Sequence, residues 1–275
     1  MLGYQWPAGI AGLVGTSKNL LRARMTALGG ARSLAYLHDM SRSLCSARLV
    51  LRSLATIFQG ALLLLCFGVG ASIGDDTPPA PTHASTQVLV FGDSLSAAYK
   101  LPAEDGWVAL LRERLDAQAP GRFEVTNASA SGETTSGGLT RLPEVLETGD
   151  YDWVLLELGA NDGLRGLPLN VIQANLQTLI DRVEARGAKV VLLGIMLPTN
   201  YGPAYADPFA AMYARLAETN DLPGLPFLLE GAASDRELML EDGLHPNAEG
   251  QKQLLENVWS VVEPLWDLNE LKPAP

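Results

Sequence analysis

Two short stretches, far apart in this chain, carry the residue types that acyl transfer requires. Ser94 lies in a Gly-Asp-Ser-Leu run at positions 92–95, directly after an apolar segment, and His245 follows Asp242 by three residues. A serine hydroxyl is a weak nucleophile until a base takes its proton. A carboxylate three residues before an imidazole can accept a hydrogen bond from the ring and hold it in one tautomer. These residues predict a nucleophile, a base and an orienting carboxylate, and hence hydrolysis through a covalent acyl-enzyme.

The positions of the histidines limit which one can serve as the base. The chain has three, His38, His83 and His245. We expect the first two to lie outside the folded domain, which leaves His245. Two other interpretations are open: Asp242 and His245 cap a C-terminal helix that begins near residue 246, or they bind a metal. The metal is disfavoured, because the domain holds no second histidine and no cysteine as a further ligand.

Five apolar runs predict the strands that position these groups. They are Val88–Phe91, Phe123–Asn127, Trp153–Leu158, Val190–Ile195 and Pro226–Leu229. Between them, apolar residues recur at helical spacing and predict the buried faces of four helices. Those faces comprise Trp107, Val108, Leu110, Leu111 and Leu115; Val171, Ile172, Leu176, Leu179, Ile180 and Val183; Phe209, Met212, Tyr213 and Leu216; and Leu254, Leu255, Val258, Val261 and Val262. Apolar strands that alternate with amphipathic helices predict a three-layer α/β/α sandwich around a parallel sheet.

Polar or glycine-containing loops follow the predicted strands, at the end of the sheet where α/β proteins bind ligands. Ser94 follows the first strand, Gly132 lies in the loop after the second, and Asn161 lies in the loop after the third. Each of the latter two, taken alone, is an ordinary loop residue. Together they offer a closely approachable backbone N–H and a side-chain amide, which are donors for an oxyanion.

Charge divides the chain into two unlike parts. Residues 1–71 contain seven basic residues and one acidic residue, whereas the whole chain has a formal net charge of −11, so the remainder carries −17. This asymmetry predicts a basic targeting segment ahead of an acidic domain. An acidic domain has no electrostatic reason to bind nucleic acid or anionic lipid.

The leader has the features of a secretory signal peptide. Residues 53–74 contain no charged residue, and small residues follow the apolar centre at 61–67. This pattern predicts cleavage near Ala71 and export to the periplasm of a bacterium. An uncleaved anchor is the alternative, because about 20 apolar residues can span a bilayer; Gln59 and three glycines disfavour it, so we expect no membrane span in the mature protein. A lipoprotein site at Cys66 is disfavoured, because two leucines precede it, and Met40 is a second candidate for the translation start.

The remaining boundaries follow from composition. Residues 72–86 contain three prolines and predict a disordered linker; residues 87–266 predict the folded domain, and residues 267–275 a tail. Both cysteines, Cys45 and Cys66, lie in the leader. The mature chain therefore has neither a disulfide nor a thiol nucleophile.

Four blocks of the domain resemble the SGNH, or GDSL, hydrolase family, which is named after the serine, glycine, asparagine and histidine that stand here at 94, 132, 161 and 245. The matching segments are 92–97, 127–129, 131–134, 157–166, 197–202 and 242–247, and they extend over most of residues 87–250. The resemblance implies a flavodoxin-like fold with a five-stranded parallel sheet in the order 2-1-3-4-5. One departure is Ala160, where relatives often have glycine. This difference bears on the length of acyl chain that the protein prefers.

The resemblance also implies roles for individual residues. Ser94, Asp242 and His245 would form the catalytic triad, and the backbone N–H groups of Ser94 and Gly132, with the Asn161 amide, would hold the oxyanion. A mobile loop at 163–168 would lie beside the acyl groove, which Leu164, Leu197 and Pro198 would line. No metal or cofactor is required. The implied substrates are small acyl esters and thioesters, with arylesterase, lysophospholipase and acyl-CoA thioesterase activities, and we expect a monomer.

Two rival functions remain. The first is a carbohydrate or cell-wall O-deacetylase of the same fold, which would present polar loops to a sugar. An apolar wall favours acyl chains instead; it comprises Met196, Leu197, Pro198, Tyr201, Tyr205 and Phe209. The second rival is a binding module without catalysis, which the presence of all four blocks disfavours.

Overall fold

The computed structural model describes residues 85–268 of the 275-residue chain. The predicted signal peptide at 1–71, the predicted linker up to residue 84 and the chain after residue 268 lie outside the described residues. Within residues 85–268, no helix has the length and apolar character that would let it cross a membrane.

Five parallel strands form one sheet in the order β2-β1-β3-β4-β5, as expected. The strands are β1 (Thr86–Gly92), β2 (Phe123–Asn127), β3 (Trp153–Glu157), β4 (Lys189–Leu193) and β5 (Gly224–Leu225). The central strands are continuous apolar runs because helices cover both faces of the sheet. In β1, the side chains from Val88 to Phe91 are completely buried.

The fifth strand is not where the sequence pattern placed it. Strand β5 consists of Gly224 and Leu225, which pair with Leu192 and Leu193 of β4, and the predicted run at 226–229 is not a strand. Pro226 has no N–H to contribute to a ladder. Phe227, Leu228 and Leu229 are buried in a turn instead, so this apolar run indicated burial and not an extended conformation. The second predicted strand coincides with β2, and the predictions for β1, β3 and β4 differ from the observed strands by one or two residues at their ends.

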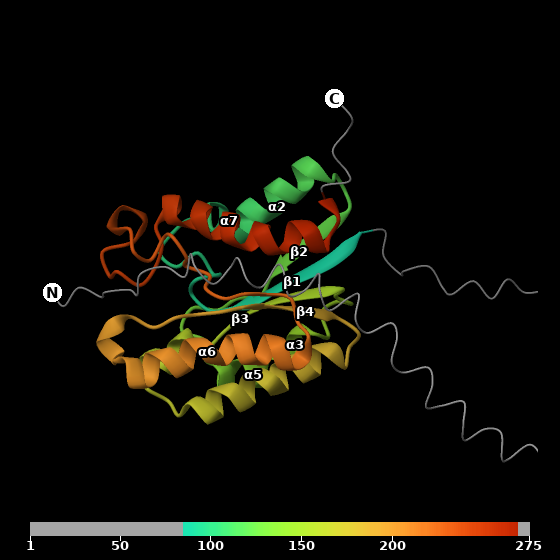
Figure 1. Ribbon diagram of the computed structural model, residues 1–275. Helices are drawn as coiled ribbons and strands as arrows, with labels where there is room; N and C mark the ends of the chain where they lie inside the picture. The colour runs from blue at the N-terminus through green and yellow to red at the C-terminus, as the bar shows by residue number, and fades with distance from the viewer. Residues whose placement is uncertain (1–84, 269–275) are drawn as a thin grey trace, which may run out of the picture. The chain divides into compact units, whose positions relative to one another are not determined.

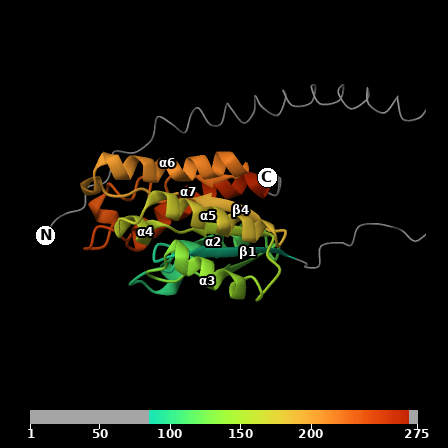
Figure 2. The same ribbon diagram turned by 90° about the horizontal axis from the view of Figure 1, so that it is seen from below.

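Helices cover the two faces of the sheet. Figure 1 shows α2 (Trp107–Gln118) and α7 (Ala248–Leu265) over one face, and α3 (Thr135–Val145), α5 (Leu169–Glu184) and α6 (Pro203–Asn220) over the other. In the second layer the helices lie in the order α3, α5, α6 (Figure 2). The three-layer arrangement confirms the predicted fold class.

The predicted helix faces are mostly buried, with one clear exception. Val171 is 45% exposed, although Ile172, Leu176 and Leu179 in the same helix are completely buried. Successive residues of a helix are about 100° apart around its axis, so Val171 lies off the stripe that Ile172 begins. It is a surface residue and not part of the core.

Two helices near the carboxyl ends of the strands were not predicted. Helix α3 contains Gly137, Gly138 and Pro143, and α4 (Ala160–Leu164) has five residues. Glycine and proline are unfavourable inside a helix, so the helix propensities of these residues do not predict α3. A Cβ at Gly138 would lie 2.7 Å from Leu158 Cδ1. This glycine therefore lets α3 pack closely against the end of β3.

Candidate active site

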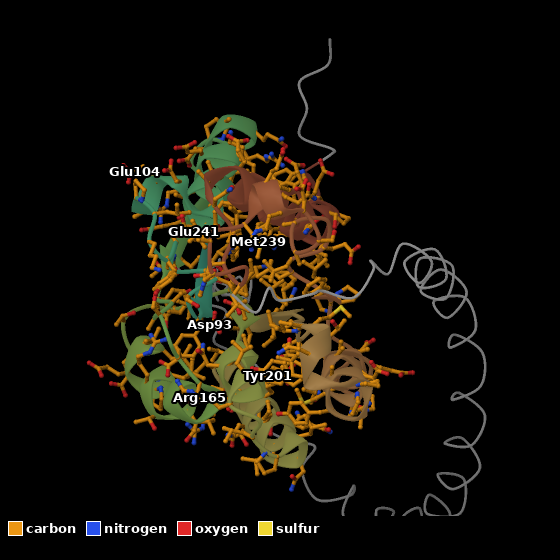
Figure 3. All side chains as sticks on the ribbon, turned by 90° about the vertical axis from the view of Figure 1, so that its left-hand side faces the viewer. Asp93, Glu104, Arg165, Tyr201, Met239 and Glu241 are labelled. Atoms are coloured by element: carbon orange, nitrogen blue, oxygen red, sulfur yellow. The ribbon has the colours of Figure 1, made fainter. Side chains whose placement is uncertain are left out.

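The predicted site residues gather at the carboxyl ends of the strands. Figure 3 looks onto this end of the sheet, with Asp93 near the centre of the view, Met239 and Glu241 on one side, and Arg165 and Tyr201 on the other. The loops after β1 and β2, the first turn after β3 and the segment before α7 all contribute hydrogen-bonding groups here. Residues distant in the sequence are thereby brought together.

The turn after β1 holds Ser94 in a half-buried position. The backbone N–H of Ala97 donates to the Asp93 carbonyl oxygen at 3.0 Å, and the N–H of Leu95 donates to Asp93 Oδ1 at 3.0 Å. A Cβ at Gly92 would lie 2.7 Å from Glu157 Oε2. Glycine therefore allows β1 to approach Glu157, and the Asp93 carboxylate braces the turn that presents the serine.

Asp242, His245 and Ser94 form a continuous hydrogen-bonded chain. The distance from His245 Nε2 to Ser94 Oγ is 2.8 Å, and the distance from His245 Nδ1 to Asp242 Oδ2 is 3.0 Å. The His245 side chain is 19% exposed and the Asp242 side chain 30% exposed. With Asp242 accepting from Nδ1–H, the other ring nitrogen is left to accept the serine proton.

Backbone hydrogen bonds hold the carboxylate of Asp242 ionised. Burial alone would raise its pKa, but the N–H groups of Leu244 and His245 both donate to Oδ1 at 3.0 Å and the His245 ring contacts Oδ2. These contacts outweigh burial and lower the pKa of Asp242 below its usual value. The group is therefore a fixed negative charge against the imidazole.

The two rival interpretations of the Asp242 and His245 pair can be compared with this geometry. Helix α7 is capped by Asn247, whose Oδ1 accepts from the N–H groups of Glu249 and Gly250 at 3.0 Å each. Asp242 is thus not the cap of this helix. In the described part of the chain, no group of three or more histidine, cysteine, aspartate and glutamate side chains is placed to hold a metal ion.

The loop after β2 brings Gly132 to the same end of the sheet. Gly132 has a φ of +80°, a conformation that favours glycine, and it is exposed. Arg141 of α3 fastens the loop: its Nη1 donates to the Ala128 carbonyl at 2.5 Å, and its Nε to Glu133 Oε2 at 2.8 Å. Its guanidinium also lies over the Phe91 ring, 4.3 Å from the centroid.

Asn161, in the first turn of α4, connects the loops after β1 and β2. Its Nδ2 donates to Asp93 Oδ2 and to the Glu133 carbonyl oxygen, at 3.0 Å in each case. The preceding Gly159 has a φ of +120°, and a Cβ there would lie 2.3 Å from the Tyr213 hydroxyl. Ala160 has no positive φ, so the backbone does not require the glycine that relatives often have.

Two buried carboxyl groups beside the site were missed by the sequence analysis. The side chains of Asp93 and Glu157 are completely buried. Burial raises the pKa of Asp93 to about 7 and the pKa of Glu157 well above its usual range. Glu157 could have been recognised from the sequence, because it ends an apolar strand and a charged residue is unusual in such a buried position.

The residues expected to line an acyl groove differ in exposure. Leu164 is partly exposed, whereas Leu197 and Pro198 are buried. Leu197 packs against Gly163, where a Cβ would lie 2.8 Å from its Cδ2. It also borders a pocket of about 120 Å³, together with Met196, Thr199, Gly202, Pro203, Ala206 and Asp207.

The predicted apolar wall needs correction, because three of its six members are buried. Phe209 is completely buried and belongs to the core, and Leu197 and Pro198 are also buried, so these side chains offer no open surface to a substrate in this conformation. Tyr201 and Tyr205 use their hydroxyl groups to hold the loop at 163–168. Tyr201 donates to the Leu164 carbonyl at 2.9 Å, and Tyr205 donates to the Leu167 carbonyl at 2.6 Å.

Comparison with known proteins identifies the family. The model of the GDSL-like Lipase/Acylhydrolase family matches residues 90–253. Esterase TesA of Pseudomonas aeruginosa is 46% identical over 182 residues, which cover 66% of this chain and 90% of that protein. Thioesterase 1/protease 1/lysophospholipase L1 of Escherichia coli K12 is 39% identical over 182 residues, covering 66% of this chain and 86% of that one.

A solved structure supports the same relationship. The psychrotrophic esterase EstA from Pseudoalteromonas sp., in a form inhibited by monoethylphosphonate, is 38% identical and has a TM-score of 0.63, with 66% of this chain and 100% of that chain covered. The extent of the family match and these identities agree with the resemblance of the four sequence blocks. The chain belongs to the GDSL-like lipase/acylhydrolase family.

Proposed function

We propose that this protein hydrolyses carboxylic esters and thioesters of acyl chains, with Ser94 as nucleophile, His245 as general base and Asp242 as the carboxylate that orients His245. The observation that carries the proposal is the distance of 2.8 Å from His245 Nε2 to Ser94 Oγ, with Asp242 3.0 Å from the other ring nitrogen. A base in hydrogen-bond reach of a hydroxyl is the requirement for activating it. Membership of the family and the names of the relatives support this reaction class.

In the proposed cycle His245 carries two protons in succession, first from Ser94 to the leaving group and then from water back to Ser94. His245 Nε2 takes the proton of Ser94 Oγ as the oxygen bonds to the carbonyl carbon, and Asp242 stabilises the positive ring. When the C–O or C–S bond breaks, His245 gives this proton to the leaving alcohol or thiol. Water then attacks the acyl-serine ester, and its proton returns through His245 to Ser94 Oγ as the carboxylic acid leaves.

The oxyanion of each tetrahedral intermediate is assigned to three donors: the backbone N–H groups of Ser94 and Gly132, and the Asn161 amide. Both N–H bonds of Asn161 Nδ2 already have acceptors, which are Asp93 Oδ2 and the Glu133 carbonyl oxygen. An amide nitrogen has only two hydrogens to donate. The oxyanion therefore takes the place of the Glu133 carbonyl, and Asp93 keeps the other N–H.

The acyl chain is assigned to the side of the site formed by Leu164, Leu197 and Pro198. Because Leu197 and Pro198 are buried, a chain reaches them when the loop at 163–168 moves away from Leu197. Lysophospholipids and acyl thioesters are the substrate classes that the relatives' names suggest, and acyl esters of phenols are a third class that the family resemblance implies. A carbohydrate O-deacetylase and a non-catalytic binding module are the alternatives that the experiment below distinguishes.

The cellular setting is also part of the proposal. The basic and then apolar leader supports export to a bacterial periplasm with cleavage near Ala71. The acidic remainder of the chain disfavours nucleic acid as a partner. A monomer that binds small acyl substrates and needs no cofactor is the arrangement that we propose from the family resemblance. N-terminal sequencing of the exported protein tests the cleavage site.

The function is tested by hydrolysis of p-nitrophenyl esters from acetyl to palmitoyl, beside lysophosphatidylcholine and palmitoyl-CoA. We expect turnover of medium or long acyl esters, lost in Ser94→Ala, and covalent labelling of Ser94 by a fluorophosphonate. Turnover restricted to acetyl esters of sugars would favour the O-deacetylase. Absence of both labelling and turnover would favour the binding module.

A further inference from the structure

Two carboxyl groups behind the candidate site are completely buried and contact each other. Asp93 follows β1 and Glu157 ends β3, and neither has solvent-exposed surface. The backbone N–H of Asp93 donates to Glu157 Oε2 at 3.1 Å, so the two groups are close neighbours out of contact with water. Burial raises the pKa of both carboxyl groups, and the charge of Asp93 raises the pKa of Glu157 further. Two ionised carboxylates so close together in a low-dielectric interior would repel each other strongly. The pair therefore holds a proton.

The contacts of the individual oxygens distinguish the two groups. Asp93 Oδ1 accepts from the N–H of Leu95 and Asp93 Oδ2 from Nδ2 of Asn161, both at 3.0 Å. Glu157 Oε2 accepts from the N–H of Asp93 at 3.1 Å and from Ser96 Oγ at 2.8 Å. Glu157 Oε1 is buried and receives no donor from the described residues. An ionised oxygen in that position would be costly, which makes Oε1 the site of the proton.

We propose that Glu157 is the protonated member, that it donates its proton to the Asp93 carboxylate in a hydrogen bond, and that this singly charged pair positions the amide of Asn161. The inference rests on the proposed role of Asn161 as an oxyanion donor. Asp93 holds one N–H of Nδ2, and this contact orients the second N–H, which Glu133 accepts until an oxyanion replaces it. Asp93 and Glu157 are thus positioning residues that do not touch the substrate.

The surroundings of the pair keep its charge low. Burial is the main influence on both groups, and the carboxylate of Asp162 in α4 repels a charge on Asp93. The phenol of Tyr213 in α6 also lies near the pair, and burial together with the carboxyl charges raises its pKa. Neither of these neighbours carries a positive charge. When Asp93 takes up a proton in acid, it ceases to be a full acceptor for Asn161, and the amide loses its anchor.

Three substitutions separate this arrangement from a purely structural one. Asp93→Asn removes a charged acceptor, so at about pH 8 we expect kcat to fall on the order of 10- to 100-fold with KM little changed. Glu157→Leu should cause a similar loss. Glu157→Gln replaces a neutral acid with a neutral amide that still donates to Asp93, so it should restore kcat to within about threefold of the wild type. A larger loss in Glu157→Gln than in Asp93→Asn would overturn the proposal.

A double-mutant cycle tests whether the pair acts through Asn161. In an Asn161→Ala background, adding Asp93→Asn should lower kcat no further, because the amide to be positioned is gone. Additive losses would contradict the positioning role. An Asn161→Ala protein with unchanged kcat would instead refute the proposed oxyanion role, so the two failures are distinguishable.

A matched control comes from the opposite end of the sheet. Asp152 Oδ2 accepts the backbone N–H of Gln87 at 2.7 Å, so Asp152→Asn also removes an acceptor for an N–H. This variant should leave kcat and its pH profile unchanged. In Glu157→Gln, by contrast, the acid limb of kcat should shift, because Asp93 loses its titrating partner.

Infrared difference spectroscopy locates the proton without an activity assay. At about pH 8 the wild type should show the carbonyl band of a buried protonated carboxyl group, present in Asp152→Asn and absent from Glu157→Gln. A band that persists in Glu157→Gln would place the proton elsewhere and overturn the assignment. A Glu157→Gln protein that fails to fold would also count against it, because a neutral amide should replace a neutral acid.

Discussion

The ring of Tyr99 packs against the imidazole of His245, with ring centroids 4.3 Å apart and planes inclined by 37°. Tyr99 lies in the turn that begins at Ser94, between Ala98 and Lys100, which both have positive φ values. This left-handed backbone is unfavourable for residues other than glycine. The turn thus carries both the candidate nucleophile and the ring that limits rotation of the candidate base.

We expect Tyr99→Ala to lower kcat about two- to tenfold, because an aromatic pair of this kind contributes about 0.5–1.5 kcal/mol. Tyr99→Phe keeps the ring and should stay close to the wild type. Steady-state hydrolysis of a p-nitrophenyl ester measures both. Equal losses in the two variants would show that the hydroxyl group matters and not the packing.

Ser94→Ala should lower kcat on the order of 10⁴- to 10⁶-fold, because no other group can take up the acyl chain. The half-buried serine contributes little to packing, so the thermal unfolding temperature should change little. Esterase assays with circular dichroism measure both quantities. Activity within tenfold of the wild type would reject Ser94 as nucleophile.

Asp242→Asn should lower kcat on the order of 10³- to 10⁴-fold, because an amide can present a donor to His245 Nδ1 and favour the wrong tautomer. The substitution also leaves one acceptor oxygen for Leu244, His245 and the ring, all of which the carboxylate now serves. Asp235 is a matched control: within residues 85–268 its Oδ1 accepts a single hydrogen bond, from the N–H of Glu237, and Asp235→Asn should leave kcat unchanged. An Asp242→Asn protein as active as this control would exclude the orienting role.

Tyr205→Phe and Tyr201→Phe should each loosen the loop at 163–168. The hydroxyl groups donate to the carbonyls of Leu167 and Leu164, and a neutral hydrogen bond contributes about 1 kcal/mol. Amide hydrogen exchange at 164–167 should therefore quicken about fivefold in each variant and further in the double variant. Unchanged exchange in the double variant would mean that other contacts hold the loop.

Protein stability should fall as pH rises from about 4 to about 7, because the buried pair keeps protons that the same groups lose in the unfolded chain. Burial raises the pKa of Asp93 to about 7 and the pKa of Glu157 well above its usual range. Unfolded carboxyls titrate near about pH 4, so between about pH 4 and 7 the folded state binds more protons than the unfolded state. Each such proton lowers the free energy of unfolding by about 1.4 kcal/mol per pH unit.

Asp242 acts in the opposite direction, because its pKa is lowered. Its contribution to stability is complete above the unfolded pKa of about 4 and is lost as pH falls through the folded value. Urea unfolding at about pH 5 and about pH 7 separates the two effects, since the contribution of Asp242 is already complete in that window. Glu157→Gln should reduce the pH dependence there, and an unchanged slope would contradict the buried-pair explanation.

Sequence patterns predicted the elements whose signals are local. The strand at 88–91 and the helix stripe at 172–183 are regular apolar runs, and both elements are present. The apolar pattern wrongly predicted a strand at 226–229, where the residues are buried but do not pair with a neighbouring strand. It also missed helix α3, in which the close packing of Gly138 against Leu158 outweighs the poor helix propensity of glycine.

The amino-acid sequence by itself determined the chemical groups available, the apolar periodicity and the family blocks, because these depend on residue types and short spacings. Only the tertiary structure decided which groups meet. Ser94 and His245 are 151 positions apart, yet their side chains are 2.8 Å from each other. Glu157 reaches Asp93 because β1 and β3 pair in a register that sets Gly92 beside Glu157. Such contacts depend on strand register and loop conformation, which are set by the packing of the whole domain.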